Sequence, residues 1–289
     1  MEGSRTALEA DWLACCRAAV RELRAMLDAV SGIGERVRET GTRGEGGDRT
    51  LVIDERAEAC VFAQLDALHA AGHRFTALSE ERGVVDYGSD AVRVVIDPID
   101  GSLNAKRLMG AHALSVAVAA GPTMADVVFG YVYDFGADEE WHARRGGGAC
   151  LDGRPLDPAV GERRGRSGRL ELVGIEQADP RLVARAVGHL EEQAERLRAL
   201  GAIAVTMCQV AAGRMDGMLS LKGCRAVDAA AAQLIVREAG GVVAFPARAG
   251  VGAADEHGLA HTPLDVEPRS PVVAARTRAS LRALATVHA

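Results

Sequence analysis

Aromatic residues are scarce in this sequence, and basic residues are fewer than acidic ones. Phe, Trp and Tyr make up 3% of the 289 residues, so a core drawn from the 48% of hydrophobic residues must consist mainly of Val, Leu, Ile and Ala. That content is sufficient for one large domain or two lobes. The formal net charge is −6. Proteins that hold nucleic acid through its phosphate backbone carry an excess of Lys and Arg, so the composition argues against a nucleic-acid partner.

The sequence also lacks a long uninterrupted apolar run. Its longest apolar region, residues 112–133, contains a Gly-Pro pair and Asp126, and it predicts two strands joined by a turn rather than a membrane span. Residues 1–10 are polar and charged, so we expect no cleavable signal there. These features predict a protein without a membrane-spanning segment or a membrane partner.

The six cysteines show no C-x-x-C spacing. Cys15 and Cys16 are adjacent on a predicted helix, where disulfide geometry is poor, and the other four are isolated in the sequence. Reduced thiols are typical of proteins in a reducing compartment, so we expect a cytoplasmic location.

Several well-known catalytic and cofactor motifs are missing. There is no G-x-S-x-G, no P-loop and no H-E-x-x-H in the chain. His69 and His73 have helical i, i+4 spacing, but a metal site normally needs further ligands, so a surface metal pair is the less favoured interpretation. The glycine-rich residues 44–47 and 146–148 do not lie between a strand and a helix, and they predict a loop and a hairpin turn.

Residues 96–102, Ile-Asp-Pro-Ile-Asp-Gly-Ser, are the most informative stretch of the chain. The apolar run before them predicts a short buried strand, and Pro98 and Gly101 predict that it ends in a tight turn. Asp97 and Asp100 then lie close together, where their repulsion is unfavourable unless a cation lies between them. Carboxylate oxygens on a rigid turn suit Mg²⁺. Taken alone, the motif is equally compatible with an ordinary solvated turn.

Three further stretches place polar residues at the ends of predicted elements. Glu80 and Glu81 follow an apolar approach, Asp228 lies at the start of a predicted helix, and Asp54 follows Thr50 directly before another helix. Surface exposure or helix capping explains each of them separately. Together with the aspartates of residues 96–102, they favour a single shared site.

In this order, the four stretches resemble the inositol monophosphatase-like family of Mg²⁺-dependent, lithium-sensitive phosphatases. The resemblance extends from about Trp12 to residues 269–275. Within the family, the chain looks most similar to the archaeal and bacterial enzymes that accept inositol monophosphate, fructose 1,6-bisphosphate, or both. The features that carry it are the Gly44…Thr50…Ile53-Asp54 layout, Leu-Ser-Glu-Glu-Arg-Gly at residues 78–83, and Arg-Ala-Val-Asp at residues 225–228.

The resemblance implies two or three Mg²⁺ ions as cofactors. The ligands implied for the first two ions are Glu81, Asp97, the backbone carbonyl of Ile99, Asp100 and Asp228. Asp97 would bridge these two ions. A third, more weakly bound ion would contact Glu81, with Glu80 close by. Glu45 and Asp48, in the glycine-rich loop, are weaker candidates for a metal contact.

The resemblance also implies how water and substrate are held. Asp54 would pair with the hydroxyl of Ser102, through or beside Thr50, to polarise the attacking water, with Glu81 taking part. The backbone amides of Gly101 and Ser102 would receive phosphate oxygens at the start of a helix. The family usually has Thr at the position of Ser102, and this change keeps the hydroxyl group.

Four acids facing a phosphate would repel it, so the acids imply metal ions and the metal ions imply an anionic substrate. In inositol-selective relatives, a glutamate about seven residues before the last metal aspartate receives ring hydroxyls. Leu221 holds that position here and cannot accept those hydrogen bonds. Arg225 and Lys222, with Lys106 and Arg107, are candidates for contacting a second phosphate, as in fructose 1,6-bisphosphate. Solvated surface charge is the alternative explanation for these four residues.

We therefore expect a Mg²⁺-dependent phosphomonoesterase that acts on a small sugar or cyclitol phosphate. One alternative is a nucleotidase acting on 3′-phosphoadenosine phosphate. Another is a non-catalytic relative that binds phosphorylated ligands, which the complete set of acids makes less favourable. A homodimer is implied by the resemblance.

Alternating blocks of helices and strands predict an α/β protein, and the resemblance implies a layered αβαβα sandwich. We expect an N-terminal α+β lobe over residues 1–145 with most metal ligands, and a C-terminal α/β lobe over residues 146–289 with Asp228. The site then lies in the cleft between them. Periodicity predicts helices over residues 12–30, 51–71, 180–200, 207–214 and 227–239, and a short strand over residues 203–205.

Overall fold

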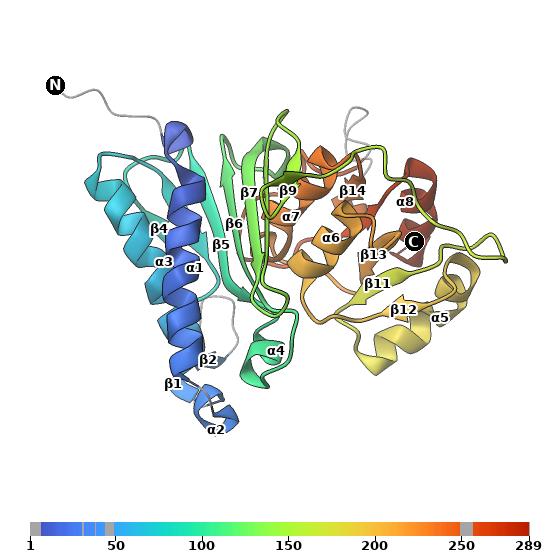
Figure 1. The fold of residues 1–289 in the computed structure, drawn as a ribbon, viewed down its shortest axis with the longest axis horizontal. Coiled ribbons are helices and arrows are strands. Elements are labelled where there is room, and N and C mark those ends of the chain that lie inside the picture. Colours follow the sequence, from blue (N-terminus) through green and yellow to red (C-terminus); the bar gives the residue numbers. More distant parts are fainter. Residues whose placement is uncertain (1–6, 31, 38, 44–48, 249–256, 289) are drawn as a thin grey trace.

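The computed structural model describes residues 7–30, 32–37, 39–43, 49–248 and 257–288. Helices and sheets alternate in five layers (Figure 1), which confirms the predicted αβαβα sandwich. One outer layer contains α1 (Trp12–Ala29) and α3 (Val52–Ala70), and the middle layer contains α6 (Ile203–Ala211) and α7 (Ala226–Glu238). The opposite outer layer contains α5 (Pro180–Gln193) and α8 (Arg278–Ala285). Among the described residues, no helix is both long enough and apolar enough to cross a membrane.

The first sheet has eight strands in the order β10-β9-β8-β7-β6-β5-β3-β4. The strands are β3 (Thr76–Ser79), β4 (Gly83–Asp86), β5 (Arg93–Asp100), β6 (Ala113–Ala119), β7 (Val127–Asp134), β8 (Glu139–Arg144), β9 (Ala149–Leu151) and β10 (Arg154–Pro155). Neighbouring strands are antiparallel except for the parallel pair β3 and β5. Residues 146–148 join β8 to β9, as predicted for a hairpin turn.

The second sheet has five strands in the order β12-β11-β13-β15-β14. They are β11 (Val173–Glu176), β12 (Leu197–Arg198), β13 (Gly217–Ser220), β14 (Val242–Ala244) and β15 (Val273–Ala275). A separate antiparallel pair is formed by β1 (Glu39–Arg43) and β2 (Arg49–Leu51), and two short helices are α2 (Ile33–Arg36) and α4 (Ser102–Lys106). The division into lobes at residues 145 and 146 remains a prediction.

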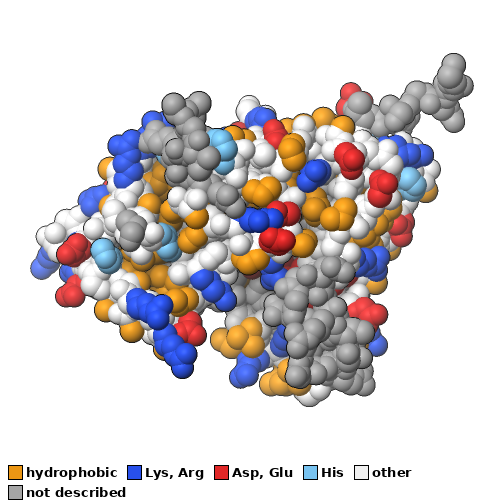
Figure 2. All heavy atoms as spheres, turned by 180° about the vertical axis from the view of Figure 1, so that it is seen from behind, with side chains coloured by type: hydrophobic (Ala, Val, Ile, Leu, Met, Phe, Trp, Pro, Cys, Tyr) orange, Lys and Arg blue, Asp and Glu red, His pale blue; other side chains and the backbone are white. Residues whose placement is uncertain are grey.

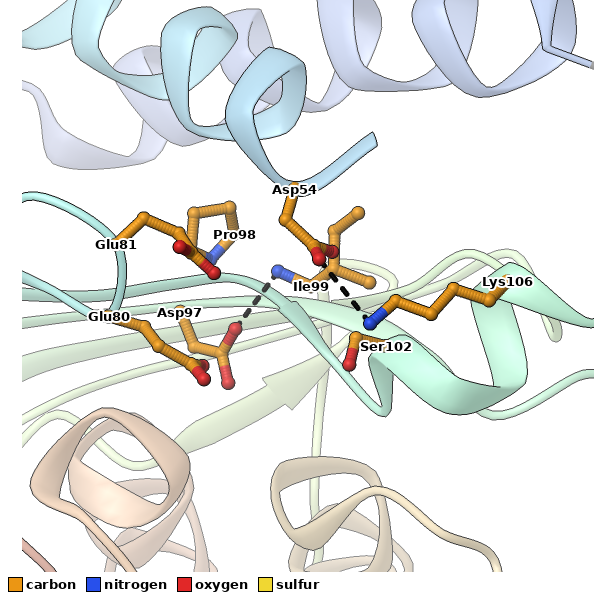
Figure 3. A pocket seen from close by; sticks show the side chains of 8 residues that line it. All are labelled: Asp54, Glu80, Glu81, Asp97, Pro98, Ile99, Ser102 and Lys106. Carbon is orange, nitrogen blue, oxygen red and sulfur yellow. Dashed lines mark hydrogen bonds and ion pairs between the residues drawn. The ribbon is translucent and has the colours of Figure 1, made fainter. Parts of the chain in front are cut away.

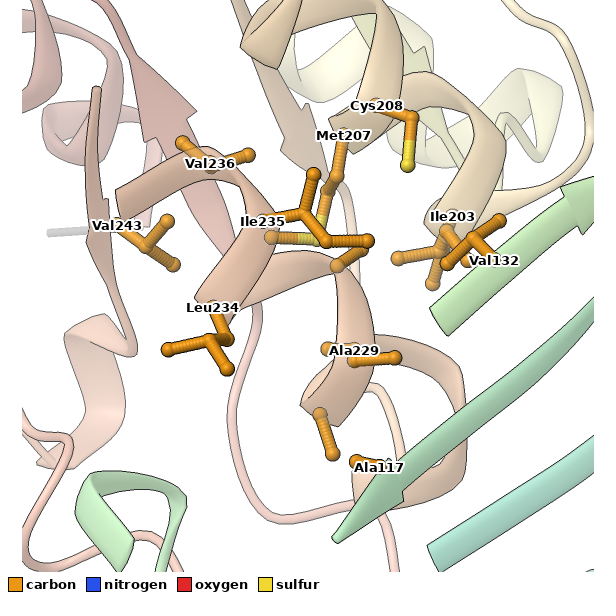
Figure 4. Packing of buried hydrophobic residues seen from close by; sticks show 14 of the residues in the cluster. Ala117, Val132, Ile203, Met207, Cys208, Ala229, Leu234, Ile235, Val236 and Val243 are labelled. Carbon is orange, nitrogen blue, oxygen red and sulfur yellow. The ribbon is translucent and has the colours of Figure 1, made fainter. Parts of the chain in front are cut away.

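The middle layer contains the largest group of buried hydrophobic residues. Side chains of α6 and α7, among them Ile203, Met207 and Ile235, fill the space beside the first sheet (Figure 4). Gly130 lets α7 approach β7, because a Cβ atom at this position would lie 2.5 Å from the carbonyl oxygen of Ala231. Small residues on the helix and a glycine on the strand thus bring the middle of α7 close to the first sheet.

Three local predictions were wrong. Residues 203–205 begin α6 instead of forming a strand, since a short, fully buried apolar run has no periodicity that separates the two. The helix predicted over residues 180–200 ends at Gln193, and β12 follows it. The tight turn predicted at Pro98 is the end of β5, which continues to Asp100 with irregular pairing to β6 after Asp97. Such an irregularity tolerates a proline that cannot donate to the ladder.

On the face seen in Figure 2, Lys and Arg side chains are interspersed with Asp and Glu side chains. The chain's six cysteines are all free thiols.

Candidate active site

A cavity of about 250 Å³ lies beside the ends of β3 and β5. It is lined by Asp54, Glu80, Glu81, Asp97, Pro98, Ile99, Ser102 and Lys106. Figure 3 shows the carboxylates of Glu80, Glu81 and Asp97 directed into this space, with Asp54 approaching from the start of α3. The structure therefore brings together acids from three of the four sequence stretches around one cavity.

The parallel pairing of β3 with β5 explains why these acids meet. Ser79, the last residue of β3, pairs with Ile96 on β5. Because the two strands run parallel, the residues that follow this pair, Glu80 and Asp97, emerge side by side. Glu80 and Asp97 are accordingly neighbours, although no sequence pattern links them.

A buried acid on α3 holds the turn after β3. Glu58 is 2% exposed and accepts hydrogen bonds from the Ser79 hydroxyl and, at 3.2 Å, from the backbone N–H of Arg82. The Arg82 guanidinium also lies 3.3 Å from Glu58. Glu58 thus ties down both sides of the Glu80-Glu81 turn. It was missed from the sequence, where the only signal is an acid among the apolar residues of α3.

Asp97 is buried and strongly influenced by the neighbouring acids. Its Oδ1 atom accepts a hydrogen bond of 3.0 Å from the Ile99 N–H. Burial raises the pKa of the Asp97 carboxyl well above its ordinary value, and the charges of Glu80, Asp100 and Asp228 raise it further. An ionised carboxylate is therefore unfavourable here unless a cation is close.

Asp100 is held at the N-terminus of α6. Its two carboxylate oxygens accept hydrogen bonds from Ile203 N–H at 3.2 Å and Ala204 N–H at 2.7 Å. Burial and the charge of Asp228 raise the pKa of Asp100 well above its ordinary value, whereas the Ala204 N–H bond lowers it. The predicted metal ligand is thus placed between the first sheet and the middle layer by backbone amides of α6.

Asp228 lies in the first turn of α7 and combines both roles considered from the sequence. Its Oδ2 atom accepts a 2.8 Å hydrogen bond from the backbone N–H of Arg225, as an acid that caps a helix start does. Burial raises the pKa of Asp228, while the positive charges of Arg225 and Lys222 lower it. Its effect on the pKa of Asp97 and Asp100 places it in the same acidic cluster.

Two basic side chains lie against these acids. The Arg225 guanidinium is 2.7 Å from Glu80 and 3.9 Å from Asp228. The Lys106 amine is 3.3 Å from Asp54 across the cavity, as Figure 3 shows. Burial raises the pKa of Glu80 to about 7, although the charge of Arg225 opposes the shift.

The start of α4 requires glycine. Gly101 has φ +79°, and a Cβ atom there would lie 2.7 Å from the Ala111 carbonyl oxygen and 2.9 Å from the Cβ atom of Ala202. Ser102 follows as the first residue of α4 and lines the cavity with Asp54. This tight approach positions Ser102 at the edge of the cavity.

The remaining predicted residues are placed less directly. Thr50 lies on β2, and its side chain falls outside the described part of the structure, as do Glu45 and Asp48. Leu221 follows β13 and packs against the outer hydrophobic cluster of the second sheet. Lys222 is exposed next to it.

Glu176 is a second buried acid that the sequence did not single out. At the end of β11, it accepts hydrogen bonds from the Thr206 hydroxyl at 2.6 Å and from the backbone N–H groups of Leu200 and Gly201 at 3.1 and 3.0 Å. It therefore anchors the loop that leads into α6, whose amides hold Asp100. Only its position at the end of an apolar run hinted at this role.

The donor set fits a hard divalent cation. Oxygen atoms of buried acids that repel one another are the environment in which Mg²⁺ is favourable. Within the described residues, no three Asp, Glu, His or Cys side chains are already arranged around one metal position. The acids lie instead against Arg225, Lys106 and backbone amides.

Comparison with known proteins shows which family the chain matches. The profile described as "Inositol monophosphatase family" matches residues 10–288. A fructose-1,6-bisphosphatase/inositol-1-monophosphatase from Thermococcus kodakarensis is 31% identical over 244 residues, covering 82% of this chain and 84% of the relative. The Nus factor SuhB of Escherichia coli is 33% identical over 195 residues, covering 66% and 69%. A solved inositol monophosphatase-fructose 1,6 bisphosphatase has a TM-score of 0.78 at 23% identity, covering 96% of this chain and all (100%) of its own.

Proposed function

Since this chain belongs to the inositol monophosphatase family and is a phosphatase, we propose that it is a Mg²⁺-dependent phosphomonoesterase for small sugar or cyclitol phosphates. Inositol monophosphate and fructose 1,6-bisphosphate are the proposed substrate classes. The observation that carries this proposal is the meeting of Glu80, Glu81 and Asp97 with Asp54 around one cavity. Such a concentration of acids would repel a phosphate ester on its own, so it supports a site that works with divalent cations.

We propose that two or three Mg²⁺ ions bind at this cluster. The proposed ligands are Glu81, Asp97, the carbonyl of Ile99, Asp100 and Asp228. When bound, the ions would neutralise the phosphate and lower the pKa of a water molecule. The protein's contribution is to hold the acids in position: Glu58 fixes the Glu80-Glu81 turn, and α6 amides fix Asp100.

Water activation is assigned to Asp54 and Ser102, with Thr50 as a further candidate. Asp54 and Ser102 line the same cavity from α3 and α4. The Lys106 amine, 3.3 Å from Asp54, orients this carboxylate. A hydroxyl and a carboxylate that face one cavity can together hold a water molecule and accept its proton.

Substrate phosphate is assigned to the backbone amides of Gly101 and Ser102. Lys222 and Arg225 remain the candidates for a second phosphate, because Arg225 lies against Glu80 and Asp228 at the acidic cluster and Lys222 is exposed three residues before it. We further propose a cytoplasmic homodimer, as the resemblance implies. The six free thiols support a reducing compartment, and analytical ultracentrifugation tests the oligomeric state.

The test is phosphate release from a panel of substrates with Mg²⁺, and again with EDTA. The panel contains inositol 1-phosphate, fructose 1,6-bisphosphate, glycerol 2-phosphate, 3′-phosphoadenosine phosphate and several sugar monophosphates. Mg²⁺-dependent release from inositol 1-phosphate or fructose 1,6-bisphosphate is expected. A preference for 3′-phosphoadenosine phosphate would replace the proposed substrate class. A folded protein that releases phosphate from none of them would favour a non-catalytic ligand-binding role.

A further inference from the structure

Arg225, a candidate for contacting substrate, pairs with acids of the site itself. Its guanidinium lies inside the acidic cluster, 2.7 Å from Glu80 and 3.9 Å from Asp228. The three side chains are only 19%, 21% and 11% exposed. The guanidinium is permanently charged, so it supplies a fixed positive charge to two acids that bulk water screens poorly.

In the metal-free protein, this arrangement offsets part of the repulsion among the acids of the cluster. Asp97, Asp100 and Asp228 are buried and Glu80 is partly buried, and the negative charges of Glu80, Asp100 and Asp228 make an ionised Asp97 unfavourable. Backbone N–H groups hold the three aspartates in place. Without an ion, some other positive charge must offset their repulsion. In the described part of the chain, Arg225 provides such a charge to Glu80 and Asp228.

We propose that Arg225 is a built-in countercation, which stabilises the empty acidic cluster and lowers its affinity for the divalent ion nearest Glu80. This inference rests on the proposed metal dependence and deepens it. The guanidinium and the ion compete for the same two carboxylates. The protein therefore folds before metal arrives, at the expense of weaker binding at this position.

The side chain can be tested separately from the backbone. Asp228 is held by the backbone N–H of Arg225 at 2.8 Å, and this bond does not depend on the side chain. Arg225→Gln therefore removes the charge and keeps the start of α7. Arg225→Lys keeps the charge. Arg214→Gln is a matched control, because Arg214 pairs with Glu139 at 2.8 Å and lines a different cavity.

The experiment measures the melting temperature of the full chain in EDTA and across a MgCl₂ titration, together with Mg²⁺ binding by calorimetry. In EDTA, Arg225→Gln is expected to have a lower melting temperature than wild type, and Mg²⁺ should raise that temperature by more than it does in wild type. Half-saturation is expected at about tenfold lower Mg²⁺ concentration, because one nearby positive charge is gone. Arg225→Lys and Arg214→Gln are expected to stay within about threefold of the wild-type midpoint.

The possible outcomes separate this inference from its premise. If wild type neither binds Mg²⁺ nor gains stability from it, the proposed metal dependence fails and the inference fails with it. If wild type responds and Arg225→Gln has the same midpoint and the same melting temperature in EDTA, the inference alone is overturned. If Arg225→Lys shifts the midpoint as far as Arg225→Gln, charge is not the cause, which also overturns it. Should Arg225→Gln fold only with Mg²⁺, that supports the proposal.

Discussion

Glu58 accepts a hydrogen bond from the hydroxyl of Ser79, the last residue of β3 and the one directly before the acidic turn. Both side chains are buried, at 2% and 0% exposure. The contact joins α3 to the strand end that carries Glu80 and Glu81. A residue outside the lining of the cavity thus holds the turn that carries two of its acids.

Glu58→Ala is expected to lower the free energy of unfolding by about 1–3 kcal/mol, because it leaves the buried Ser79 hydroxyl without this partner. It is also expected to raise the Mg²⁺ concentration needed for half-maximal phosphatase activity, since the turn loses its anchor. Urea denaturation and a Mg²⁺ titration measure these effects. Combining it with Ser79→Ala gives a double-mutant cycle, and strict additivity of the two changes would contradict the coupling.

Asp97→Asn is expected to reduce phosphate release by at least about a hundredfold, as removal of a bridging metal ligand should. In EDTA, the same variant is expected to melt at a higher temperature than wild type. The reason is that burial and repulsion raise the pKa of Asp97, so its ionised form destabilises the empty protein. Near-wild-type turnover at saturating Mg²⁺ would rule out the metal assignment.

The metal-free protein is expected to lose stability as the pH rises. The pKa of Glu80 is raised from 4.5 to about 7 in the folded state, mainly by burial. Such a group contributes stability that is fully present below the unfolded pKa and is lost as the pH rises through the folded one. Urea unfolding in EDTA at pH 5, 6, 7 and 8 should show this decline. Glu80→Gln should flatten it, and an equal decline in that variant would assign the effect to other groups.

Gly101→Ala is expected to destabilise the protein by about 1–3 kcal/mol, because φ is positive and the added Cβ meets the Ala111 carbonyl oxygen. Activity should fall as well, since the start of α4 carries Ser102. Gly110→Ala is the matched control, because a Cβ there has no atom within 4 Å among those described. Equal melting temperatures for the two variants would refute the proposed close approach.

Leu221→Glu is expected to shift preference toward inositol phosphates, because it supplies a carboxylate that can accept hydrogen bonds from ring hydroxyls. Leu221 packs against the outer hydrophobic cluster, so some loss of stability is also expected. The ratio of kcat/KM for inositol 1-phosphate to that for fructose 1,6-bisphosphate measures the shift. An unchanged ratio in a folded variant would remove Leu221 as a determinant of selectivity.

Much of the fold was predictable because its signals are local. Helical periodicity located α1 and α3, alternating blocks predicted an α/β protein, and the family resemblance implied its layers. Residues 96–102 pointed to the candidate site. Residues 203–205 were misassigned because a helix buried on all sides has no polar face to mark its period. Glu58 and Glu176 escaped notice because a buried acid resembles a surface acid until its partners are known.

By itself, the sequence determined the chemistry available to this protein: acids at strand ends and helix starts, a glycine before Ser102, and alternating helices and strands. Only the tertiary structure decided which of these groups meet. The parallel pairing of β3 with β5 brings Glu80 beside Asp97, α6 amides hold Asp100, and α7 places Arg225 against Glu80. These contacts join residues far apart in the chain, and they follow from strand pairing and helix packing, which no local pattern encodes.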